Sequence, residues 1–133
     1  MAQNVPAERP LSPHLQVYRP LFTMMMSIAH RITGAGLYFG AALFAWWLVA
    51  AASGPTYFDF VNGLFGSIPG RVVLLGLTWA AIHHTLGGIR HFIWDLGYGF
   101  GARERELLAW LTLIGSLVLT PVVWIIAYML RGS

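Results

Sequence analysis

The sequence contains no cysteine and no lysine, and it has few charged residues of any kind. Eight arginines and five acidic residues make up 10% of its 133 residues, whereas a soluble domain carries roughly 25%. The absence of cysteine excludes disulfides, thiolate metal sites and covalently attached c-type haem. Because arginine keeps its proton at physiological pH, the net charge of +3 is permanent. Spread over short segments, this charge indicates membrane orientation and not nucleic-acid binding.

Long apolar runs fill most of the chain, which is 57% hydrophobic. Residues 32–52 and 107–130 contain no charged side chain, and each run is long enough to cross a bilayer as a helix. We expect three spans, at about residues 21–52, 71–95 and 107–130, because backbone groups in lipid must be paired within their own segment. The sequence therefore predicts an all-α fold in which residues 21–133 form a bundle of three transmembrane helices.

The segments outside the spans are rich in residues that interrupt helices. Residues 1–20 carry four prolines and two arginines, which predicts an extended, water-exposed N-terminal arm. Residues 53–70, rich in glycine and proline, predict a loop with aromatic residues at the membrane interface. We expect neither a signal peptide nor a mitochondrial presequence. This favours the inner (plasma) membrane of a bacterium over the mitochondrial inner membrane.

The arginines are distributed unevenly along the chain. Only Arg71 and Arg131 flank the first loop and the C-terminus. The other six belong to the arm, the start of the first span and the region around the second turn: Arg9, Arg19, Arg31, Arg90, Arg103 and Arg105. Because basic residues favour the inner side of the membrane, the N-terminus is predicted to face the cytoplasm, or the matrix.

This orientation places two polar stretches at the same membrane depth, SIAHRITG (residues 27–34) and HHTLGGIRHFIWD (residues 83–95). On a helix, Ser27 and Arg31 share a face, with His30 about 60° to one side. Ionisable groups inside a span are costly and usually mark a functional path. For Arg31 alone, snorkelling toward the membrane surface is an equally good explanation.

On the second span, His84 lies in one stripe with Gly87, Gly88 and His91. A flat macrocycle that approaches a helix needs an imidazole to reach its iron and positions without a side chain where the ring can lie. Close helix packing by itself also explains the glycines. Arginines at the same depth favour haem, because they can pair with its propionates.

His83 and His84 are adjacent and point about 100° apart, so only one of them can address the glycines. We choose His84 as the iron ligand, and expect His83 to contact a lipid headgroup, a partner helix or a propionate. Residues 107–130 contain no histidine, and His30 suits a propionate better than the deeper iron. The second axial ligand is therefore expected from another chain.

Three stretches carry a resemblance to a known family: RPLSPHLQVY (residues 9–18), SIAHRITG and HHTLGGIRHFIWD. In this order and spacing they resemble the cytochrome b membrane-anchor subunit of succinate dehydrogenase, respiratory complex II. The resemblance implies three partners: a flavoprotein that oxidises succinate, an iron-sulfur subunit that relays electrons, and a second small anchor subunit. It also implies haem b, shared with that companion anchor, and ubiquinone as the electron acceptor.

The resemblance also implies roles for individual residues. His84 matches the axial haem ligand, and Ser27 and Arg31 match the wall of the ubiquinone site. His30 and Arg31 match groups near the haem propionates, and His91 belongs to the polar end of the second span. His83 departs from the family pattern as an additional histidine beside the ligand position.

Quinone reduction takes two electrons and two protons, which agrees with these assignments. The site needs a hydroxyl and a cation at the carbonyl oxygen where negative charge develops, together with contact to water. Ser27 offers the hydroxyl and Arg31 the charge. Two other interpretations remain open: a haem-free structural anchor of a dehydrogenase, and a menaquinone-linked, fumarate reductase-type anchor with two haems.

Overall fold

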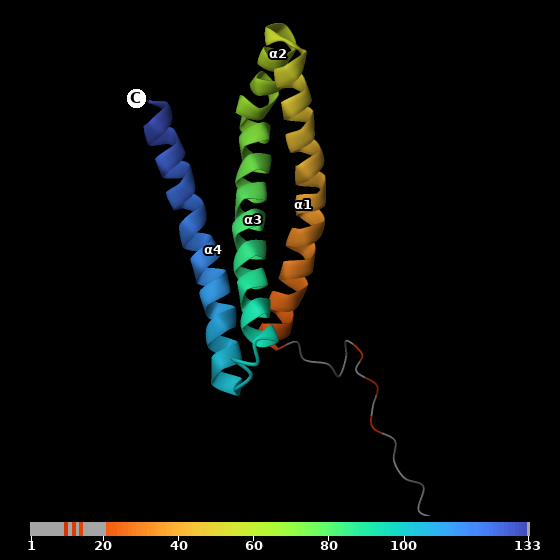
Figure 1. Cartoon of the computed structure of the whole chain (residues 1–133), viewed down its shortest axis with the longest axis vertical. Helices are drawn as coiled ribbons and strands as arrows, with labels where there is room; N and C mark the ends of the chain where they lie inside the picture. The colour runs from red at the N-terminus through yellow and green to blue at the C-terminus, as the bar shows by residue number, and fades with distance from the viewer. Residues whose placement is uncertain (1–9, 11, 13, 15–20, 133) are drawn as a thin grey trace, which may run out of the picture.

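The protein is described by a computed structural model, which covers residues 10, 12, 14 and 21–132. The described part of the chain is helical, with four helices joined by short connections: α1 (Phe22–Ser53), α2 (Pro55–Gly66), α3 (Ile68–Asp95) and α4 (Ala102–Arg131). In Figure 1, α3 stands between α1 and α4, and α2 closes one end of the α1–α3 pair. The predicted all-α fold is confirmed. Apart from three isolated positions, the predicted arm at residues 1–20 lies outside the described residues.

The three long helices α1, α3 and α4 are long and apolar enough to cross a membrane, as predicted. α4 begins at Ala102, five residues before the predicted span, and so includes a strongly charged first turn. Its start is held by the backbone N–H of Gly101, which donates to Glu104 Oε2 at 3.1 Å. The carboxylate also complements the positive N-terminal end of the helix.

The segment at residues 53–70 is not the loop that the sequence predicts, because it contains the 12-residue helix α2. Gly54, at φ 117°, ends α1, and Pro55 opens α2 at a position where proline suits a helix. The indole N–H of Trp46 donates to Tyr57 Oη at 2.7 Å, and that of Trp47 donates to Asn62 Oδ1 at 3.0 Å. These contacts with α1 support a helix whose own sequence is rich in weak helix formers.

The turn between α3 and α4 is tight and returns the chain at once into the bundle. Gly97 and Gly99 have φ values of 86° and 77°, a conformation that side chains disfavour. The Trp94 indole donates to the carbonyl of Gly99 at 3.2 Å and closes the turn. The start of α1 lies at this same end of the bundle (Figure 1), where Phe22 stacks on Trp110 at 4.4 Å between ring centroids.

The helices are apolar outside and rich in small or polar residues where they meet. Large apolar side chains are exposed along α1, α3 and α4, whereas the buried set includes Thr33, His83, Arg90, Thr112, Ser116 and Thr120. Lipid solvates apolar side chains as well as a protein core does, so membrane helices associate through small and hydrogen-bonding residues. The burial pattern therefore agrees with a bundle that lies in lipid.

Candidate functional site

Two histidines from different helices meet face to face near the end of the bundle where α1 begins. The rings of His30 on α1 and His84 on α3 stack at 3.9 Å between centroids and 14° between planes. Each ring also reaches the backbone of the other residue. His84 Nδ1 lies 3.0 Å from the carbonyl oxygen of His30, and His30 Nε2 lies 3.2 Å from that of His84.

These contacts set which ring nitrogen carries the proton. A carbonyl oxygen only accepts hydrogen bonds, so the nitrogen that faces it must donate. Nδ1 of His84 is therefore the donor in this bond, and its Nε2 has no hydrogen-bond partner among the described residues. A metal-ligating histidine usually has this arrangement, in which the far nitrogen is fixed by a backbone carbonyl.

Two glycines allow the rings to lie this close to the opposite helices. A Cβ at Gly34 would lie 2.8 Å from Cε1 of His84, and a Cβ at Gly87 would lie 2.3 Å from Cδ2 of His30. His30 thus fills the space over Gly87, where the sequence predicts room for a macrocycle. At Gly88 none of the described residues places an atom within 4 Å of such a Cβ, so of these two glycines of α3 Gly88 is the open one.

His83 belongs to a different interface, between α3 and α4. It is completely buried, its Nδ1 lies 3.1 Å from Ser116 Oγ of α4, and its ring lies 5.1 Å from that of Trp79. Its Nε2 is buried without a partner among the described residues. Of the three surroundings considered for His83, the structure therefore shows contact with a partner helix.

Arg90 and His91 lie at the same end of α3 but on different sides of it. Arg90 is seven residues from His83 and so shares its α4-facing side. It is buried, and its guanidinium lies 5.2 Å from the centroid of the Trp94 ring. His91 is exposed, with its ring 5.2 Å from that of His30. Three imidazoles, those of His84, His30 and His91, therefore follow one another toward the end of the bundle.

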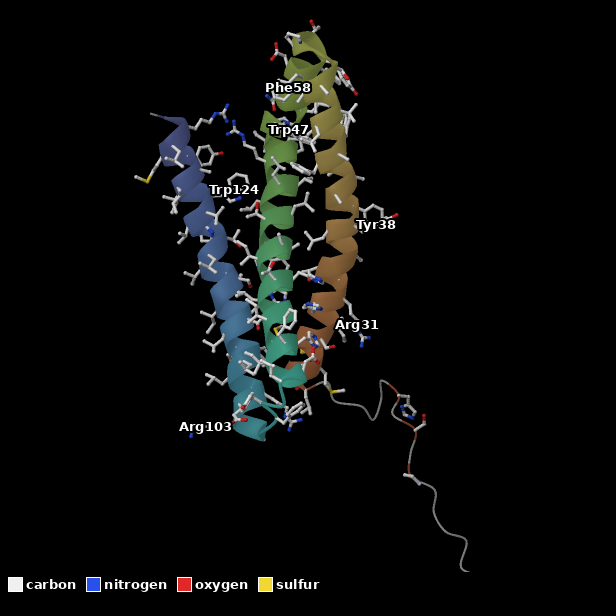
Figure 2. All side chains as sticks on the ribbon, viewed as in Figure 1. Arg31, Tyr38, Trp47, Phe58, Arg103 and Trp124 are labelled. Carbon is white, nitrogen blue, oxygen red and sulfur yellow. The ribbon has the colours of Figure 1, made fainter. Side chains whose placement is uncertain are left out.

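Ser27 and Arg31 lie on α1, three residues before and one residue after His30. Ser27 is half-buried, and Arg31 is exposed. Figure 2 shows Arg31 on the side of α1 that points away from α3. The structure thus brings His30, His84 and His91 together, whereas Arg31 and Arg90 lie on separate sides of the bundle.

Two polar residues at these interfaces were not singled out from the sequence. The hydroxyl of Thr33 is 2.9 Å from the carbonyl of His30 and 3.4 Å from His84 Nδ1, and Ser116 pairs with His83. The signal for Thr33 was its place within SIAHRITG, one turn after His30. For Ser116 the signal was weaker: it is the middle member of three hydroxyl residues spaced four apart, Thr112, Ser116 and Thr120.

Comparison with known proteins identifies the family of this chain. The family model described as "Succinate dehydrogenase/Fumarate reductase transmembrane subunit" matches residues 6–123. The chain belongs to this family. It is 39% identical over 128 residues to the succinate dehydrogenase cytochrome b556 subunit of Paracoccus denitrificans, covering 96% of this chain and 98% of the relative. The corresponding Rickettsia felis subunit is 33% identical over 123 residues, or 92% and 96% of the two chains.

A mitochondrial relative is also similar to this chain. The cytochrome b560 subunit of Sus scrofa is 38% identical over 99 residues, which are 73% of this chain and 59% of the relative. The resemblance inferred from the three sequence stretches is thus confirmed, and the chain is a membrane-anchor subunit of the complex II type, which is not catalytic alone. Its three apolar helices and its bacterial relatives identify a multi-pass protein of a bacterial inner membrane.

Proposed function

We propose that this chain anchors a succinate:ubiquinone oxidoreductase in the membrane, holds haem b together with a companion anchor subunit, and forms part of the ubiquinone-reduction site. The other partners are a flavoprotein and an iron-sulfur subunit, as the family membership implies. One observation carries the haem assignment. The bond from His84 Nδ1 to the carbonyl of His30 orients the ring and leaves Nε2 free to bind a metal.

The surroundings of His84 fit a haem. When bound, haem b takes up and releases single electrons. His84 would hold the haem iron, and His30, Arg31 and His91 would supply polar groups that can pair with the propionates. The open position at Gly88, on the same helix, offers backbone without a side chain against which a flat ring can lie.

Ser27 and Arg31 are proposed to bind the quinone head. The Ser27 hydroxyl donates a hydrogen bond to a carbonyl oxygen of ubiquinone, and Arg31 stabilises the negative charge that develops there. Arg31 is exposed and points away from α3. This position supports a site that the chain shares with a neighbouring subunit and that stays within reach of water for protons.

Two adjacent histidines provide a matched test of the haem ligand. In the purified complex, His84→Ala should abolish or shift the b-type band in reduced-minus-oxidised spectra. His83→Ala removes an equally large side chain from the next position and should leave the band in place. An unchanged haem band in the His84 variant would reject this ligand.

The haem-free anchor predicts a different result. A complex with full quinone-reductase activity and a haem-to-complex ratio near zero would support that alternative. A two-haem, menaquinone-linked anchor requires four axial ligands at two depths. α4 contains no histidine, and the histidines of α1 and α3 all lie toward one end of the bundle, so we rank this alternative last.

A further inference from the structure

A cavity with an arginine pair lies at the end of the bundle opposite the histidines. It has a volume of about 650 Å³ and lies between α2, α3 and α4. Toward the C-terminus α4 diverges from α3 (Figure 1), and the Trp124 side chain points into the space between them (Figure 2). The inner wall of the cavity is apolar and includes Leu74, Val123 and Trp124, whereas Arg71, Tyr128 and Arg131 line it as polar groups.

The two arginines at this end of the bundle line the same cavity, and no acidic side chain lines it with them among the described residues. Arg71 donates from Nε to the carbonyl of Gly66 at 2.7 Å, which fixes the guanidinium and leaves its terminal nitrogens available. Neither Arg71 nor Arg131 has an ion-pair partner among the described residues. Arg71 also lies in the first turn of α3, where the helix dipole adds positive potential. The cavity is therefore suited to an anion.

A second cavity of about 670 Å³ adjoins the first and is almost entirely apolar. The two share Asn62, Phe65, Leu74 and Thr78 in their walls. The second continues between α1 and α3 past Gly40, where a Cβ would lie 2.8 Å from Leu77. The Trp124 indole, which lines the first cavity only, donates a 3.2 Å hydrogen bond to Oγ1 of Thr78 in the shared wall. Together the cavities offer one anion site and two apolar grooves.

We infer that these cavities bind one anionic two-chain phospholipid, with its phosphate between Arg71 and Arg131. One acyl chain follows α4 along Val123 and Trp124, and the other enters the apolar cavity beside Gly40. A lipid with a net negative headgroup fits better than a zwitterionic one, because two permanent positive charges face the phosphate. Trp124 and Tyr128, which line the first cavity, are residue types typical of the membrane–water interface. This site is independent of the proposed haem and quinone sites.

The test compares two double variants in the intact, detergent-purified complex. Arg71→Gln/Arg131→Gln removes both charges from the cavity, and Arg103→Gln/Arg105→Gln removes two exposed charges at the opposite end. Phosphatidylglycerol retained per complex is measured by lipid extraction. Phosphatidylglycerol is then added back to delipidated complex, with phosphatidylcholine and inorganic phosphate as competitors. Ala127→Trp, which fills the cavity without changing charge, is the second cavity variant.

We expect the native complex and the Arg103/Arg105 variant to retain phosphatidylglycerol, and both cavity variants to lose it. Removing both arginines should weaken rebinding roughly thirty-fold, about five- to six-fold for each charge. The haem spectrum should be the same throughout, which verifies folding. Equal retention in the Arg71/Arg131 variant would overturn the proposal, as would displacement of the lipid by inorganic phosphate alone or cross-linking that places the companion anchor subunit in the cavity.

Discussion

At the scale of single residues, His83 and His84 show how a step of one residue along a helix gives two neighbouring side chains different surroundings. His83 is buried against Ser116 of α4, while His84 packs on His30 of α1. The sequence predicted that the two rings diverge, because neighbouring helical residues point about 100° apart. It could not show which helix each ring meets, because that depends on how the three helices pack around α3.

The quinone assignment can be tested at Ser27 and Arg31. Ser27→Ala or Arg31→Leu should slow succinate:quinone reduction, by roughly ten- to a hundred-fold for the arginine, because a charged hydrogen-bond donor is lost. Succinate oxidation by a soluble dye should remain unchanged, since it does not use the quinone site. Both rates are measured on the same purified complex.

Arg103→Leu is the control for this prediction. It removes an exposed arginine from the first turn of α4 and should change neither rate. If the Arg31 variant loses dye reduction and quinone reduction to the same extent, the residue supports assembly of the complex and the proposed quinone contact is wrong.

At the scale of helices, the apolar runs predicted three spans, but not α2. Its residues include Asp59, Asn62 and Gly63, which are weak helix formers. The helix is held instead by contacts with the indoles of Trp46 and Trp47, and tertiary contacts of this kind are not visible in a local pattern. The start of α4 was missed for a related reason, since charged turns beyond the lipid carry no hydropathy signal.

The α1–α3 contact depends on the absence of a side chain at Gly87. Gly87→Ala should lower the stability of the complex by about 1–3 kcal/mol, because its Cβ would displace the His30 ring. Gly76 is an exposed position of α3 where an added Cβ would meet no other residue's atom within 4 Å. Gly76→Ala should therefore leave stability unchanged or raise it by up to about 1 kcal/mol. The stability of both variants is measured by heating the complex and monitoring its loss from the size-exclusion peak. Equal behaviour of the two variants would mean that the His30 contact does not hold the helices together.

At the scale of the whole molecule, the chain buries little and exposes apolar surface along all three long helices. A single chain of this kind depends on lipid and on neighbouring subunits to cover its surface. The proposed companion anchor, iron-sulfur subunit and second haem ligand belong to other chains, so the sequence of this chain does not place them. The common depth of the two polar stretches, residues 27–34 and 83–95, was predictable, because the depth of each stretch follows from helix length and topology.

The predicted topology can be tested on the same scale, because the chain has no cysteine of its own. A cysteine at Thr56, exposed at the start of α2, should react in intact spheroplasts with a thiol reagent that does not cross membranes. A cysteine at Ala102 should react only after permeabilisation. Labelling is read on the band of this chain, and the reverse pattern would contradict an inward-facing N-terminus.

The reciprocal bonds between His30 and His84 constrain assembly. Sliding α1 against α3 by one residue, about 1.5 Å, would part both ring nitrogens from their carbonyls, so these two bonds select one register of the helix pair. The same register fixes the direction in which Nε2 of His84 points. If the proposed haem site is correct, a companion subunit would have to supply its donor from a direction that this helix pair determines.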